Sequence, residues 1–164
     1  MLQIASAATK KLAGLLTSSS GIPAAIAELS LQGMVLPAIT PHQIISQNVA
    51  FELSERSSVN KYPLLYVYCS KMVNELREKF RTFSGDAQMV VEARVSEDRL
   101  DQIESNLRAY VDAITEVLDN NRGDWGDGLF YGGGYEVTFS GVKHGGSNFI
   151  QIAKVAFILE VSAD

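Results

Sequence analysis

Residues 87–119 read AQMVVEARVSEDRLDQIESNLRAYVDAITEVLD, a strand pattern followed directly by a helix pattern. In the first nine residues, one set of alternate positions holds Met89, Val91, Ala93 and Val95, and the other holds Gln88, Val90, Glu92 and Arg94. Alternation with a period of two is typical of a strand that buries one face and exposes the other. We therefore expect a half-exposed strand over residues 87–95, with Glu92 and Arg94 on its solvent side.

The helix pattern begins directly after this strand. Ser96 is a favourable N-cap, and Glu97 and Asp98 would lie in the first turn, where acidic groups interact favourably with the helix dipole. Apolar side chains then recur mostly every three or four residues: Leu100, Ile103, Leu107, Tyr110, Val111, Ile114, Val117 and Leu118. The spacing predicts an amphipathic helix from Ser96 to Asp119, with about 22 helical residues over roughly 33 Å.

Strand patterns also lie on either side of this unit. Residues 64–69 (LLYVYC) form an aromatic and β-branched run after Pro63, typical of a buried strand. Residues 135–139 and 149–161 predict a hairpin, residues 84–86 a turn, and residues 71–83 no clear element. The expected fold class is α+β: a two-layer, mostly antiparallel sheet of about four strands packed on one long helix.

The first 35 residues are rich in Ala, Leu and Ser and contain no aromatic residue. They predict one short helix that ends near residues 18–21 and a second that begins at Pro23. We expect an N-terminal helical arm over residues 1–35, an α+β domain over 36–164, and a folded core after removal of the arm. Thr40 and Pro41 predict a further helix start, although residues 48–53 also alternate enough to form a strand.

Composition limits the classes of protein that this chain can belong to. It has 164 residues, 46% of them hydrophobic, and its 14 basic and 19 acidic residues give a net charge of −5. An acidic chain is a poor candidate for coating nucleic acid, because Lys and Arg drive that binding. Cys69 is the single cysteine, which excludes an internal disulfide and favours a small buried thiol. We also expect no membrane span and an intracellular origin.

The motifs predict no catalytic residue, no cofactor and no metal site. His42 and His144 lack a second ligand at metal-binding spacing, and no Gly-x-Ser-x-Gly motif occurs. The glycine-rich residues 123–134 precede a strand pattern, whereas a phosphate-binding loop leads into a helix. Asp124 and Asp127 lack the alternating ligands and the final bidentate carboxylate of a calcium loop. We expect a connector with aromatic anchors there.

The placement of charge is more informative than these motifs. Five basic residues and two acidic ones lie between positions 61 and 81, whereas nine acidic and three basic residues lie between 97 and 127. These segments could be two solvated faces, or the basic segment of one copy could meet the acidic helix of a neighbour. Repeated head to tail with rotation, that contact would close a ring. The candidate subunit-interface residues are Arg77, Lys79, Arg81, Asp101 and Glu104.

Four segments carry a family resemblance: residues 61–68 (KYPLLYVY), residues 83–95 (FSGDAQMVVEARV), the acidic helix at 96–119 and the closing strand at 150–161. Over residues 40–162 the chain resembles the tail terminators of tailed bacteriophages, the neck proteins of the minor tail protein U group. The resemblance implies a non-enzymatic subunit of the virion, assembled in the host cytoplasm. It implies a homohexameric ring at the head-proximal end of the tail tube, which stops tube growth.

The resemblance also implies the partners. These are further copies of the chain, the tail tube protein and a head-completion or connector protein, with a sheath protein as an additional neighbour; no membrane is involved, and DNA passes through without specific binding. The first 35 residues and residues 123–134 depart from the family pattern, which leaves the position in the neck open. One alternative is another connector or a tail-tube subunit, although tube subunits usually need a larger closed sheet than the four predicted strands supply. The other alternative is a small cytoplasmic ligand-binding domain or enzyme.

Overall fold

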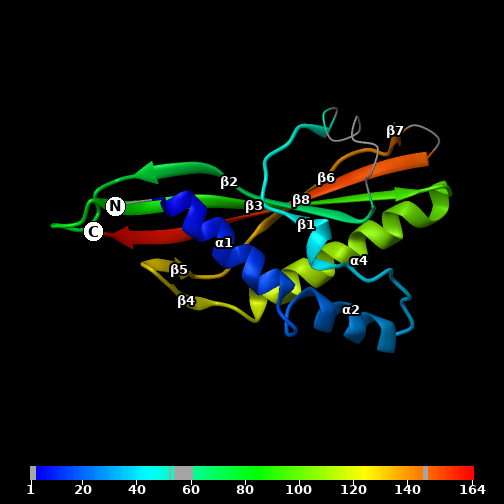
Figure 1. The fold of residues 1–164 in the computed structure, drawn as a ribbon, viewed down its shortest axis with the longest axis horizontal. Helices are drawn as coiled ribbons and strands as arrows, with labels where there is room; N and C mark the ends of the chain where they lie inside the picture. The colour runs from blue at the N-terminus through cyan, green and yellow to red at the C-terminus, as the bar shows by residue number, and fades with distance from the viewer. Residues whose placement is uncertain (1–2, 52, 54–60, 146–147) are drawn as a thin grey trace.

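The computed structural model describes residues 3–51, 53, 61–145 and 148–164. The fold is α+β, with N-terminal helices and a curled mixed sheet of eight strands (Figure 1). The helices are α1 (Ile4–Thr17), α2 (Ile22–Leu31) and α4 (Leu100–Asp119), with a 3-10 turn at Pro41–Gln43. The strands are β1 (Ile44–Ile45), β2 (Leu64–Asn74), β3 (Phe83–Glu97), β4 (Gly123–Gly126), β5 (Leu129–Tyr131), β6 (Glu136–Phe139), β7 (Lys143–Gly145) and β8 (Asn148–Ala163).

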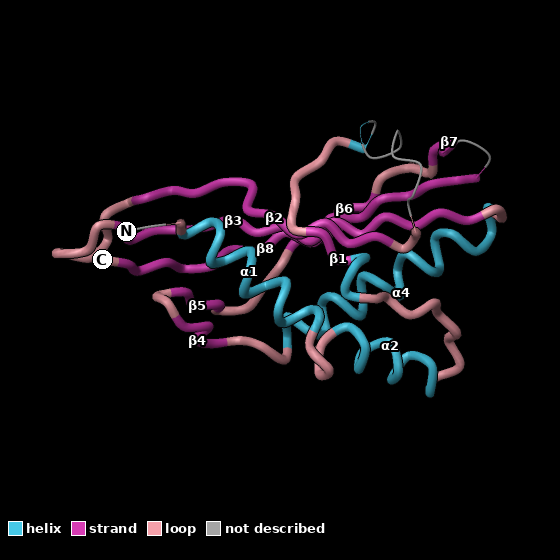
Figure 2. The backbone as a smooth tube through the Cα atoms, in the orientation of Figure 1, coloured by secondary structure: helices cyan, strands magenta, loops and turns pink. Residues whose placement is uncertain are grey.

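Three long antiparallel strands, β2, β3 and β8, run along the longest axis of the molecule (Figure 2). β3 pairs with β8 over its whole length, from Phe83 opposite Ala163 to Glu97 opposite Phe149. The other edge of β8 is shared by β7, β6 and β5, and β4 extends the sheet beyond β5. β1 adds a short parallel pairing to the start of β2. β3 and β8, with 15 and 16 residues, are therefore the longest strands and form the centre of the sheet.

The sheet has eight strands where the sequence predicted about four. The four additional strands, β1, β4, β5 and β7, hold only two to four residues each, too few to show a period of two. The turn predicted at residues 84–86 is also wrong, because these residues lie inside β3. A Cβ added to Gly85 would come within 1.9 Å of the carbonyl oxygen of Val73, so this glycine permits close strand approach. The predicted antiparallel pairing of residues 135–139 with 149–161 is confirmed as β6 with β8, although β7 lies between them in the chain and also pairs with β8.

α4 packs across β3 and β8 and buries nine side chains, which confirms the predicted long helix. Its first residue is Leu100, four positions after the predicted N-cap at Ser96. Ser96 still pairs with Ile150 in the β3–β8 ladder, so its backbone is extended at that point. The strand pairing thus overrides a favourable local capping signal.

α1 lies on the same face of the sheet as α4 (Figures 1 and 2). Ile4, Ala8, Leu12 and Leu16 recur every four residues, and all four are buried in the core cluster that contains α4, β3 and β8. α2 packs on α4 and adds Ile22, Ala25 and Ile26 to the same cluster. Residues 4–31 therefore share one hydrophobic core with the sheet.

By length and composition, Ile4–Leu31 is apolar enough to cross a membrane, although the sequence led us to expect no such span. In the structure this segment is two helices joined by a turn at residues 18–21. A Cβ on Gly21 would come within 2.2 Å of the carbonyl oxygen of Leu15, so the turn needs a glycine. A core helix passes the same length and composition test, and α1 buries its apolar side against the sheet.

The helix predicted from Pro41 is a single 3-10 turn. Thr40 and Gln43 form the capping box of this turn, but the Gln43 side chain also reaches the start of β2. Its Nε2 donates hydrogen bonds to the carbonyl oxygens of Pro63 (2.9 Å) and Lys61 (3.3 Å). The chain then continues as β1, because this anchor holds Ile44 and Ile45 beside β2.

Candidate subunit interface

The five candidate interface residues lie at two ends of the molecule. Arg77, Lys79 and Arg81 belong to the β2–β3 turn (residues 75–82), at the left in Figure 1. Asp101 and Glu104 belong to the first turns of α4, whose N-terminal end is at the right in the same view. The structure does not bring the basic and acidic groups together within one copy. A contact between them requires a second copy.

A compact network of hydrogen bonds fixes the backbone of the β2–β3 turn. The Asn74 side chain accepts from the N–H groups of Leu76 (3.3 Å) and Ser84 (3.0 Å) and donates to the carbonyl oxygen of Thr82 (3.0 Å). The Ser84 hydroxyl oxygen accepts from the N–H of Glu78 at 2.9 Å. The long turn is thus held in one shape although it projects from the sheet.

Two of the three basic side chains in this turn are paired within the molecule. The Arg77 guanidinium donates to both carboxylate oxygens of Asp86 (2.9 and 2.8 Å) and to Glu75 (2.6 Å). Arg81 pairs with Asp164 at 2.6 Å. These carboxylates raise the pKa of Arg77 and of Arg81, so both guanidinium groups stay charged. Lys79 forms no ion pair with any residue that the structure describes.

The turn also exposes large apolar side chains. Phe80 is 99% exposed and Leu76 is 64% exposed. Both have positive φ, 67° and 51°, a conformation that costs on the order of 1 kcal/mol or more for a bulky residue. Exposed apolar groups on a well-held turn indicate a contact surface. The sequence analysis missed Phe80, although its position between Lys79 and Arg81 in a segment with no clear period was a usable signal.

The acidic end is an exposed helix surface. Asp101 and Glu104 are both exposed, and Glu104 accepts a hydrogen bond from Arg108, one helical turn further on, at 3.1 Å. An exposed pair of this spacing contributes only a few tenths of a kcal/mol, about 0.3–0.5 kcal/mol. The carboxylates of Asp101 and Glu104 are therefore accessible to a partner, but no strong contact within the chain fixes their side-chain positions.

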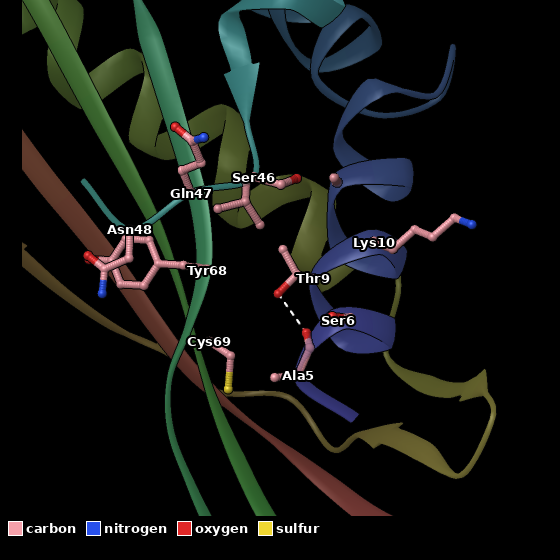
Figure 3. A pocket seen from close by; sticks show the side chains of 11 residues that line it. Ala5, Ser6, Thr9, Lys10, Ser46, Gln47, Asn48, Tyr68 and Cys69 are labelled. Carbon is pink, nitrogen blue, oxygen red and sulfur yellow. Dashed lines mark hydrogen bonds between the residues drawn. The ribbon is translucent and has the colours of Figure 1, made fainter. Parts of the chain in front are cut away.

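A groove of about 450 Å³ runs between α1 and β2 (Figure 3). It is lined by Ala5, Ser6, Thr9, Lys10, Ala13, Ser46, Gln47, Asn48, Val67, Tyr68 and Cys69. Within the described part of the chain, β1 pairs with β2 only at Leu65 and Tyr66, so the edge of β2 is open from Val67 onward. An open edge can accept a strand from another chain.

Cys69 lies in β2, as the sequence predicted, and lines this groove. Its side chain is half-buried rather than fully enclosed. Burial raises the pKa of the thiol, which lowers its reactivity at neutral pH. The groove therefore presents a backbone edge together with a thiol of low reactivity.

The opposite face of the sheet holds a buried ion pair. Arg94 pairs with Glu92, with 2.7 Å between Nε and Oε2, and it also donates to the carbonyl oxygen of Val49 at 2.6 Å. Its guanidinium lies 4.1 Å from the centre of the Tyr66 ring. The Tyr68 hydroxyl donates to Glu92 at 3.4 Å, and burial, followed by the nearby Glu92 charge, raises the pKa of Tyr68 to about 12.

The expected solvent exposure of Glu92 and Arg94 is wrong, because their side chains are 7% and 2% exposed. Ile45 and Val49 pack on this face against the cluster that contains Tyr66 and Tyr68, and the Val49 carbonyl oxygen accepts the hydrogen bond from Arg94. The single-strand pattern could not reveal this packing, because the segment that contains Val49 lies about 45 residues earlier in the chain. The pair anchors that segment to the sheet.

The glycine-rich residues 123–134 contain the β4–β5 hairpin, and Trp125 and Tyr131 enter the core as the predicted aromatic anchors, whereas Phe130 is exposed. The rings of Trp125, Tyr131 and Phe157 lie 5.1 to 6.0 Å apart, centre to centre. His42 lies in the 3-10 turn, and His144 in β7 contacts the ring of Phe149. Among the described residues, no group of three or more His, Cys, Asp or Glu side chains could hold a metal ion.

Comparison of the sequence with protein-family models gives no matching family, and comparison with curated proteins gives no matching relative.

Proposed function

We propose that this chain is a structural virion protein, a tail terminator that forms a ring at the head-proximal end of a bacteriophage tail tube. In this role the ring stops tube growth and joins the tail to head-completion proteins, and the chain has no catalytic role. The observation that supports it most is the pair of unlike ends. A rigid turn with exposed Phe80 and Lys79 lies at one end, and an acidic helix surface lies at the other.

Unlike ends suit a ring better than a two-fold dimer. In a two-fold dimer the same patch meets itself, whereas a ring joins two different patches of each copy. The two patches here carry opposite charge, which favours correct register and fast encounter. In this proposal the fold has two layers, a sheet and the helices that pack on one of its faces. The open edge of β2 gives each copy a second surface for contact with a neighbouring subunit.

Net charge is compatible with a ring around DNA. Six copies would carry about six times the charge of −5, and an acidic lumen would not hold the phosphate backbone. DNA would then pass through without specific binding. The other partners in this proposal are the tail tube protein, a head-completion or connector protein and, in a contractile tail, the sheath protein.

The test is assembly of the purified chain, alone and with tail tubes, followed by light scattering and negative-stain microscopy. We expect a closed ring of about six copies that caps one end of each tube and stops its growth. A chain that stays monomeric with and without tubes would contradict the proposal.

A tail-tube subunit is the second candidate. The sequence argument against it was a sheet of only about four strands, and the observed sheet has eight. The same experiment separates the two functions, because a tube subunit would stack into long filaments, whereas a terminator would form single rings that end them.

A further inference from the structure

The exposed end of the β2–β3 turn carries an apolar ring between two cationic side chains, which suits it to insert into a pocket on a partner. We define the Phe80 tip as Lys79, Phe80 and Arg81. The Phe80 ring is 99% exposed, so it is not packed among the residues that the structure describes. Arg81 is held by Asp164, and Lys79 keeps its charge available. A phenyl group presented between two cations fits an apolar hollow with an acidic rim.

The same chain contains such a hollow between α2 and α4. We define the α2–α4 hollow by its lining residues: Ala25, Glu28, Leu29, Gln32, Asp112, Ala113 and Glu116. Its volume is about 110 Å³. The apolar part is well formed, because Ala25 is 6% exposed and Ala113 is 1% exposed. The two helices therefore pack closely at the floor of this small depression.

Three carboxylates surround this depression. Glu28, Asp112 and Glu116 are exposed, and none forms an ion pair with any residue in the described part of the chain. Three like charges around one small hollow repel one another, and a cation placed there would relieve the repulsion. The rim thus favours an approaching Lys or Arg.

Size and position agree with the charges. An apolar cavity of about 150 Å³ accommodates benzene, so an open hollow of this smaller volume is of the right order for the outer part of a phenyl ring. The β2–β3 turn, which carries the Phe80 tip, lies at one end of the longest axis, far from α2 and α4, which line the hollow (Figure 1). One copy cannot place its own tip in its own hollow, so the occupant must come from another copy.

We propose that the Phe80 tip of one copy inserts into the α2–α4 hollow of the next copy, with Lys79 facing Glu28, Asp112 and Glu116. The contact is head to tail and leaves one tip and one hollow free on every open chain of copies. It rests on the proposed function, since it specifies the surface through which the ring forms. It also replaces Asp101 and Glu104 with the rim carboxylates as the acidic partners.

The test uses two single-surface variants of the full chain. Phe80→Ala removes the ring of the tip, and Glu28→Lys with Asp112→Lys reverses the rim of the hollow. All three positions are exposed, so both variants should keep the circular dichroism spectrum and unfolding midpoint of the wild type. Each variant alone should self-associate about tenfold or more weakly in sedimentation velocity. Phe130→Ala, at a phenylalanine that is 45% exposed elsewhere, is the matched control and should assemble normally.

Mixing the two variants gives the decisive result. The rim variant still carries an intact tip and the Phe80→Ala variant still carries an intact hollow, so the mixture should form one-to-one pairs that neither variant forms alone. Normal rings from Phe80→Ala would overturn this contact and leave the terminator proposal in place. A wild-type chain that remains monomeric even on tail tubes would overturn both.

Discussion

Arg94 and Arg77 each bind carboxylates, but in opposite environments. The Arg94 side chain is 2% exposed on the covered face of the sheet, and the Arg77 side chain is 43% exposed on the β2–β3 turn. A buried pair is costly to break, because the remaining charge stays out of water, whereas an exposed pair is easily replaced by solvent. The comparison indicates that the first pair holds the fold and the second holds only the shape of a surface turn.

The largest expected effect is at the buried pair. Arg94→Met leaves Glu92 without its main partner, and we expect the free energy of unfolding to fall by about 3–5 kcal/mol. Urea denaturation measures this loss. Arg77→Met, the matched control, should leave the midpoint almost unchanged. Adding Glu92→Leu to Arg94→Met should recover part of the stability, and equal losses for Arg94→Met and Arg77→Met would remove the distinction between the two pairs.

The contrast between buried and exposed side chains also applies to two leucines. Leu12 in α1 is fully buried, and we expect Leu12→Ala to lower the free energy of unfolding by about 2–5 kcal/mol. Leu31 is 89% exposed, and Leu31→Ala should change stability by less than about 0.5 kcal/mol. Thermal unfolding with both variants checks this, and a harmless Leu12→Ala would mean that α1 contributes little to the core.

The burial of α1 also changes the outcome that we expect from truncation. The sequence indicated that the core would stay folded without residues 1–35. In the structure their removal uncovers the part of the sheet beneath Ala8, Leu12 and Leu16. We therefore expect the truncated chain to lose cooperative unfolding in urea.

A smaller effect should appear at high pH. Burial favours the neutral phenol of Tyr68, so its folded pKa of about 12 lies above the unfolded value of about 10. The stability from this group is complete below about pH 10 and is lost as the pH rises towards 12, by at most about 1.4 kcal/mol per pH unit. Tyr68→Phe should flatten this decline. The residual slope reports the other buried tyrosines, since burial also raises the pKa of Tyr110 and of Tyr131.

The smallest effect on stability should come from the exposed pair, and it should be local. Arg77→Ala frees Asp86 and Glu75 but leaves the Asn74 and Ser84 hydrogen bonds in place. We expect faster amide hydrogen exchange in residues 75–82 with an unchanged global midpoint. Unchanged exchange in the turn would show that its backbone network is sufficient without the ion pair.

Much of the central architecture could be predicted from local patterns. The alternation at residues 87–95 identified a strand, and the spacing from Leu100 to Leu118 identified α4. Both segments are long enough for periodicity to exceed chance. The short strands β1, β4, β5 and β7 could not be found, because their pairing with other strands, not their own composition, makes them extended.

The candidate site was predictable only in part. Charge counting found the β2–β3 turn, but it could not show that Arg77 and Arg81 are paired within the chain. Asp86 reaches Arg77 through the antiparallel pairing of β2 with β3, and Asp164, 83 residues from Arg81, reaches the turn because β8 pairs with β3. Phe80 and the α2–α4 hollow became visible for the same reason, since exposure and concavity are properties of the assembled surface.

By itself, the sequence determined the periodic elements, the acidic balance and the separation of basic and acidic segments, because these depend on spacing and composition along the chain. Only the tertiary structure decided which charges are buried, which are compensated and which remain available. Those properties depend on water access and on contacts between residues tens of positions apart, so they exist only once the sheet and helices have packed together.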